Sequence, residues 1–192
     1  MTIDQAIENY NNSLLAGQAA FANPASGGER RYLAGDLFES LTTDLIACTD
    51  RTIAEDKYVR SRTINGLSLD NLQVDRHISH NGVLESLCEC KTYLDACYLK
   101  RAVFDFNQIC LSPDAPDVKT LGILTGQICV SPVTRVFTLD LARQLTGLDI
   151  EIFVVNTSKR RFGTKQLLDP SCAKDFALDI SELQRFIDWV SE

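Results

Sequence analysis

An acid and a lysine stand two positions apart at the end of an apolar segment of the chain. Glu89 and Lys91 flank Cys90, and the run before them, 83–88, has the composition of a buried strand. Side chains on a strand alternate between its two faces, so Glu89 and Lys91 are expected to point the same way. Cys88 and Cys90 are expected to point to the opposite face. Together with a second acid, such a pair can bind a divalent metal ion and activate a water molecule.

Asp75, on the preceding strand-like segment, can supply the second acid. The pattern Asp75…Glu89-Cys90-Lys91 resembles the PD-(D/E)xK nuclease superfamily, which includes most type II restriction endonucleases. The resemblance covers about residues 33–156. It implies an α/β (α+β) fold with an αβββαβ core, a mixed sheet flanked by helices. It also implies a Mg²⁺-dependent type II restriction endonuclease, which hydrolyses phosphodiester bonds in double-stranded DNA at a short specific sequence.

The resemblance assigns roles to individual residues. Asp75 and Glu89 would give carboxylate oxygens to Mg²⁺, a hard cation that prefers oxygen ligands and retains waters. The backbone carbonyl of Cys90 would complete the metal ligands. Lys91 would position or deprotonate the attacking water. Glu39, on the first core helix, would add a ligand or a supporting contact, although a solvated glutamate on a helix face has the same pattern.

The hairpin between the two strands decides whether the carboxylates can converge. A two-residue loop, Asn81-Gly82, would turn Asp75 away from Glu89, because a shift of one residue exchanges the faces of a strand. A three-residue loop over 80–82, or a bulge that gives the same shift, brings the two acids to one face. We predict this second arrangement. If the carboxylates lay on opposite faces, Asp70 would be the alternative acid.

Local groups of basic residues are candidates for contacts with DNA. One group follows the last expected strand and combines cations with an aromatic ring and a glycine, and another lies beside Gly27-Gly28. Arginine and lysine bind phosphates, and arginine forks also read guanine in the major groove. A solvated surface loop has the same composition, so this alternative stays open. The candidate DNA-binding residues are Arg30, Arg31, Lys159, Arg160, Arg161 and Lys165.

Composition limits the other classes of protein. The 192 residues predict a single nuclease-like domain over 1–192, without a bilayer-spanning stretch or a nucleotide-binding Gly-rich lysine motif. Seven cysteines without a CxxC pair or a signal peptide predict free thiols in the cytoplasm rather than a zinc site. The net charge of −7 argues against nonspecific coating of nucleic acid. An enzyme with local positive charge remains compatible with it.

Hydrophobic periodicity predicts alternating helices and strands. The expected helices cover 3–21, about 33–48, 94–109, 138–145 and 180–190, and the expected strands cover 58–64, 72–78, 83–91, 121–124 and 150–155. Asp179 and Glu182 are placed as a capping box for the last helix. Ser131-Pro132 is a candidate recognition loop.

A homodimer is the expected active form, because cutting both strands of a palindrome needs two sites related by a two-fold axis. The N-terminal helix or the C-terminal face with Phe186 and Trp189 could form its interface, although that face could equally be core. Two other functions stay open. One is a structure-specific repair, phage or junction-resolving nuclease, and the other is a non-catalytic α/β module that binds DNA or protein.

Overall fold

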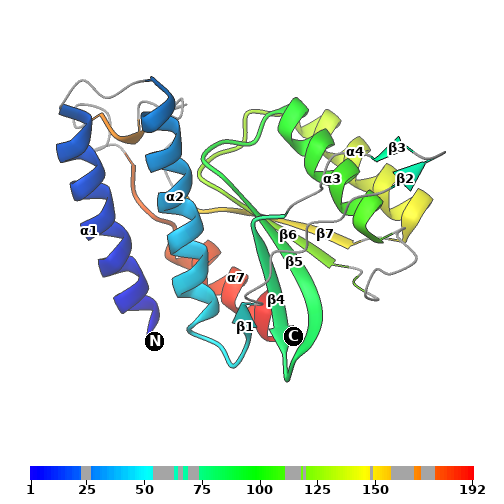
Figure 1. Cartoon of the computed structure of the whole chain (residues 1–192), viewed down its shortest axis with the longest axis horizontal. Coiled ribbons are helices and arrows are strands. Elements are labelled where there is room, and N and C mark those ends of the chain that lie inside the picture. Colours follow the sequence, from blue (N-terminus) through cyan, green and yellow to red (C-terminus); the bar gives the residue numbers. More distant parts are fainter. Residues whose placement is uncertain are drawn as a thin grey trace.

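The computed structural model describes residues 1–22, 27–53, 63–64, 67–68, 74–110, 118, 120–147, 149–156, 167–169 and 176–192. A five-stranded mixed sheet with the order β1-β4-β5-β6-β7 lies at its centre, and helices cover both faces (Figure 1). Its strands are β1 (Thr52–Ile53), β4 (Arg76–His80), β5 (Val83–Lys91), β6 (Thr120–Thr125) and β7 (Asp149–Val154). A separate two-stranded sheet pairs β2 (Thr63–Ile64) with β3 (Leu67–Ser68). The fold is therefore α+β, as the element order predicted.

One face of the sheet is covered by α2 (Gly27–Ile46) together with α1 (Ile3–Ala22) and α7 (Ile180–Ser191) (Figure 1). Cys88 and Cys90 of β5 point into this core, and Phe38 of α2 and Phe186 of α7 are fully buried there. The expectation that the two cysteines face away from Glu89 is confirmed. The cysteines whose side chains the structure describes are free thiols, at positions 48, 88, 90, 97 and 129.

The other face is covered by α3 (Ala96–Cys110) and α4 (Pro132–Thr146). Leu87 of β5 and Ile123 of β6 are buried against them. Strands β5, β6 and β7 run parallel to one another. Parallel neighbours need a crossover connection, and α3 and α4 provide these connections. The carboxyl ends of β5 and β6 therefore lie side by side, at the same end of the sheet. No described helix has the length and apolarity that crossing a membrane requires.

The hairpin between β4 and β5 differs from the predicted loop. His80 pairs with Val83, so that the loop has two residues, and Asn81 and Gly82 both have positive φ, of 51° and 78°. The predicted three-residue loop is wrong. A bulge between Ile78 and Ser79 then shifts the register by one residue. The shift runs opposite to the predicted one and brings Asp75 level with Glu89 rather than Leu87, but the two acids still share a face.

Helix α4 begins earlier than its apolar spacing predicts. Ser131 is its N-cap, the Ser131 side chain accepts a hydrogen bond from the Thr134 N–H at 3.2 Å, and Pro132 occupies the first helical position. Proline is favoured there because an N–H at the first helical position has no acceptor within the helix, so its absence costs no hydrogen bond. The interpretation of Ser131-Pro132 as a recognition loop is therefore wrong, since these residues start a helix.

Candidate active site

Asp75, Glu89 and Lys91 meet at the carboxyl end of β5. The Lys91 Nζ lies 3.3 Å from Asp75 Oδ2 and also pairs with Glu89 Oε1. The three side chains keep 22%, 15% and 23% of their surface exposed, in chain order. The group is therefore mostly removed from water and still open to a substrate at one side.

The backbone of β5 and its neighbours holds this group in place. The Cys90 N–H donates to Asp75 Oδ2 at 2.8 Å, so the carboxylate of Asp75 is fixed to the strand that carries the other two residues. The Gly126 N–H donates to the Lys91 carbonyl at 3.1 Å, which closes the turn after β6 against β5. Only glycine fits at position 126, since a Cβ would lie 2.6 Å from the Thr92 carbonyl oxygen. The position of the Asp75 carboxylate is thus set by a hydrogen bond from the strand that carries Glu89 and Lys91.

Burial and charge shift the ionisation of the group. Burial, followed by the Asp75 carboxylate, raises the pKa of Glu89 to about 7, although the Lys91 ammonium acts in the opposite direction. Burial lowers the pKa of Lys91, but the two carboxylates outweigh it and hold that pKa above its usual value. With both acids ionised the site carries one negative charge more than Lys91 neutralises. It is suited to a cation.

The donor set agrees with Mg²⁺. Magnesium is commonly held by one or two carboxylates, with waters and substrate phosphates completing its six ligands. Asp75 and Glu89 provide two such carboxylates at a partly open site. Within the described ranges, no three His, Cys, Asp or Glu side chains gather closely enough to hold a metal ion by themselves. A third oxygen from the protein would have to come from the backbone, and the Cys90 carbonyl stays the predicted donor.

Glu39 does not join the carboxylate pair. Its Oε2 binds Arg76 Nη1 at 2.9 Å, and Arg76 also donates to the Asp75 carbonyl at 2.6 Å and to Thr43 Oγ1 at 3.0 Å. Glu39 thus supports the backbone at Asp75 through Arg76, and the expectation that it is a direct metal ligand is not met in this structure. Arg76, which makes these contacts, was not singled out from the sequence. Its only signal in the sequence is that it follows Asp75.

The remaining predicted residues cannot be placed at the site. Lys159, Arg160, Arg161 and Lys165 lie outside the described residues, as does Asp70. Arg30 and Arg31 belong to α2, but their side chains are also outside the described part of the chain.

The C-terminal face with Phe186 and Trp189 belongs to the core. Phe186 is fully buried, and Trp189 packs against the same cluster. It lies over β6 at Gly122, where a Cβ would be only 2.7 Å from the indole ring. This face therefore belongs mainly to the core, and Trp189 stays partly exposed at its margin.

No protein-family model matches this chain, and no curated protein matches it significantly.

Proposed function

We propose that the chain is a Mg²⁺-dependent nuclease that hydrolyses phosphodiester bonds in double-stranded DNA. The observation that carries the proposal is the convergence of Asp75, Glu89 and Lys91 at the end of β5, which brings two hard oxygen ligands and an ammonium to one partly open point. These are the groups that metal-assisted phosphodiester hydrolysis needs.

The element order supports the same proposal. Leaving aside the separate β2–β3 pair, helix α2 is followed by the antiparallel strands β1, β4 and β5 of the main sheet, then by α3 and by β6, which runs parallel to β5. This order of the main-sheet elements is compatible with the αβββαβ core that the resemblance to the PD-(D/E)xK superfamily implies. The first acid precedes the second strand of this series, and the Glu-x-Lys pair ends the third.

The residues of the site divide the chemistry between them. Asp75 and Glu89 would hold Mg²⁺, which, when bound, lowers the pKa of a coordinated water and offsets charge on the phosphorus in the transition state. Lys91 has a raised pKa and is therefore protonated at neutral pH. A protonated lysine is a poor base, so Lys91 donates a hydrogen bond to the attacking water or to a phosphate oxygen. Arg76 keeps the Asp75 backbone against α2.

Within this chemistry we propose a type II restriction endonuclease, acting as a homodimer at a short specific sequence. The full-length protein is incubated with supercoiled plasmid and unmodified genomic DNA, in Mg²⁺ and in EDTA. Discrete fragments that depend on Mg²⁺ are the expected result. Cleavage restricted to branched or nicked DNA would assign a structure-specific nuclease instead. DNA that stays intact in both Mg²⁺ and Mn²⁺ would contradict nuclease activity and favour a binding module.

Arg76→Ala should reduce cleavage by about 10–100-fold, the usual effect of losing a group that orients a metal ligand. The substitution removes the contacts to Glu39 and to the Asp75 carbonyl. The Mg²⁺ concentration that gives half-maximal rate should rise, which loss of stability alone would not produce. Arg143→Ala is the matched control, because Arg143 pairs with Asp149 on the surface. Equal Mg²⁺ dependence in Arg76→Ala and the wild type would show that Arg76 has no positioning role.

A further inference from the structure

Helix α4 carries apolar side chains on two opposite sides. Ala142 is buried and Leu139 packs against the same core, as expected of a helix that covers a sheet. On the other side, Val133, Phe137 and Leu141 follow one another at intervals of four residues, and they are 80%, 66% and 42% exposed. Residues four apart lie on one face of a helix, so these side chains form an apolar stripe that faces water.

The stripe belongs to a wider apolar surface. Val136 of α4 and Phe104 of α3 are each more than half exposed. Phe104 lies two positions from the buried Ala102 and Phe106, so it points away from the core, and α3 and α4 cover the same face of the sheet (Figure 1). We call five side chains the α3–α4 surface: Phe104, Val133, Val136, Phe137 and Leu141.

Exposure of large apolar side chains is concentrated on this surface. The described part of the chain exposes four others, and these lie singly at the N-terminus, on α1, at the β4–β5 hairpin and at the start of α7: Met1, Leu15, Val83 and Ile180. Single exposed hydrophobic residues are normal on a protein surface, whereas a contiguous apolar patch marks a site of interaction. The α3–α4 surface is such a patch.

The area of the α3–α4 surface fits one half of a protein–protein interface. Its five side chains expose on the order of 500 Å² of apolar area, if a fully exposed phenylalanine offers about 200 Å² and valine and leucine correspondingly less. A standard interface covers about 800 Å² on each partner, of which about 60% is apolar, and so it needs about the same apolar area. Neighbouring polar residues would form the rim.

The charges beside this surface favour a protein as the partner. Arg101 of α3 pairs with Asp105 at 3.4 Å, and Arg143 of α4 pairs with Asp149 at 3.0 Å. These arginines are therefore already neutralised by the chain itself. DNA and anionic membranes bind surfaces with an excess of positive charge, which these pairs do not provide.

The spacing of the stripe favours a second copy of the same chain. Val133 precedes Phe137 by four residues, and Leu141 follows it by four. A two-fold axis beside Phe137 would set α4 of a second copy antiparallel to the first and bring the two Phe137 rings together. Val133 would then face the partner's Leu141. Both ends of the stripe would thus meet an apolar counterpart.

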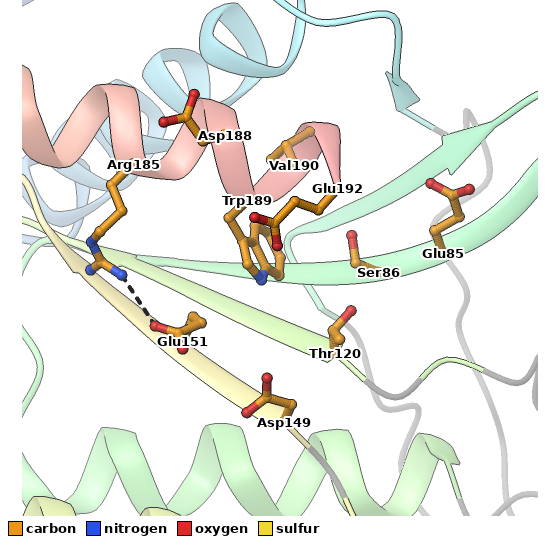
Figure 2. A pocket seen from close by; sticks show the side chains of 10 residues that line it. All are labelled: Glu85, Ser86, Thr120, Asp149, Glu151, Arg185, Asp188, Trp189, Val190 and Glu192. Atoms are coloured by element: carbon orange, nitrogen blue, oxygen red, sulfur yellow. Dashed lines mark hydrogen bonds and ion pairs between the residues drawn. The ribbon is translucent and has the colours of Figure 1, made fainter.

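The surface at the end of α7 is unsuited to such a two-fold contact. Figure 2 shows the pocket there, where five of the ten lining residues are acids and Arg185 is paired with Glu151. A two-fold contact would bring the acids of one copy close to the same acids of the other. Like charges placed together across an interface oppose association.

We propose that the α3–α4 surface is the interface of a homodimer, in which α4 packs antiparallel on α4 of a second copy around Phe137. This inference rests on the proposed homodimeric enzyme and adds the face through which the two copies meet. It is tested without DNA or metal, so that its outcome is separate from that of the cleavage assay.

Sedimentation velocity of the full-length protein over a range of concentrations measures the dimer dissociation constant. A reducing buffer prevents crosslinking through the exposed Cys97. We expect a reversible dimer, and Phe137→Asp should raise its dissociation constant at least about 30-fold, the effect of losing a central interface residue. Leu15→Asp is the matched control, because it places the same charge at an exposed leucine of α1 and should leave the dissociation constant unchanged. Circular dichroism checks that both variants are folded.

The antiparallel register has a test of its own. Val133→Glu and Leu141→Lys should each weaken the dimer, because each places one charge in an apolar contact. The double variant should dimerise more tightly than either single variant, since the two opposite charges then meet across the interface. Within one helix these positions are about 12 Å apart, too far to pair, so the rescue requires the second copy.

The proposal is overturned if the wild type stays monomeric at submillimolar concentration, or if the dimer withstands Phe137→Asp. Dissociation by Leu15→Asp alone would place the contact on α1 instead. Binding of a monomeric wild type to phosphatidylcholine vesicles, lost in Phe137→Asp, would assign the surface to lipid. A dimer that Phe137→Asp dissociates but that cleaves no DNA would support this interface and contradict only the nuclease. Cleavage by a monomeric wild type would contradict only the interface.

Discussion

Lys91→Ala is expected to lower the rate of DNA cleavage by about 10²–10³-fold, the range seen when a group that stabilises transition-state charge is removed. In this structure the Lys91 ammonium lies between the Asp75 and Glu89 carboxylates. Its removal takes away a cation that competes for these ligands, so metal affinity should stay equal or increase. Loss of cleavage with retained metal binding is therefore the specific signature of Lys91.

The two acids should behave differently from the lysine. Glu89→Ala and Asp75→Asn should each abolish cleavage through loss of a metal ligand. Asp75→Asn should keep or tighten DNA binding, because it removes a negative charge that repels phosphate. Single-turnover cleavage, metal titration and circular dichroism on all three variants make the comparison, with Glu8→Gln as an exposed acid control. Wild-type rates in any of the three folded variants would end the assignment of this site.

Local pattern was enough to predict the strand that carries the chemistry. The strand expected over 83–91 is β5, Val83–Lys91, and its alternation placed Glu89 and Lys91 opposite Cys90 as observed. The reason is that side-chain alternation is a property of the strand itself and needs no knowledge of its neighbours. The last helix was also predicted from local pattern. Asp179 caps it, by accepting from the Ser181 and Glu182 N–H groups.

Contacts between distant segments could not be predicted in the same way. Glu182, the second residue of the expected capping box, turns instead to the Val154 N–H of β7, at 3.0 Å. Glu39 meets Arg76 because α2 packs on β4, and no spacing within either segment indicates that contact. The bulge at Ile78 likewise depends on pairing with β5. Both the support of Asp75 and the register of the site thus arise from tertiary packing.

The raised pKa of Glu89 has a consequence for stability. A carboxyl group whose pKa is higher in the folded protein stabilises the fold when protonated. That contribution is complete below the ordinary pKa of 4.5 and is lost as the pH rises through about 7. The difference between these two values corresponds to at most about 3 kcal/mol. The ionised Glu89 therefore destabilises the protein at pH 8 when no divalent metal is bound.

Glu89→Gln should consequently raise the free energy of unfolding by about 1–3 kcal/mol at pH 8 in EDTA, because glutamine stays neutral. The gain should shrink as the pH falls and disappear near pH 5, where Glu89 is protonated in the wild type as well. Denaturant unfolding at several pH values measures this difference. Mg²⁺ should stabilise the wild type and not the variant, since a ligand that binds only the folded state raises its stability.

Glu182→Gln is the matched control, with the opposite sign. Burial opposes the ionised form of Glu182, but Arg185 and the Val154 N–H outweigh it and hold the pKa of Glu182 below its usual value. Its stabilising contribution is present above the ordinary pKa and is lost as the pH falls. Glu182→Gln should therefore destabilise the protein at pH 8. If Glu89→Gln instead destabilised the protein equally at pH 5 and pH 8, its carboxylate would be a structural partner of Lys91 rather than a strained metal ligand.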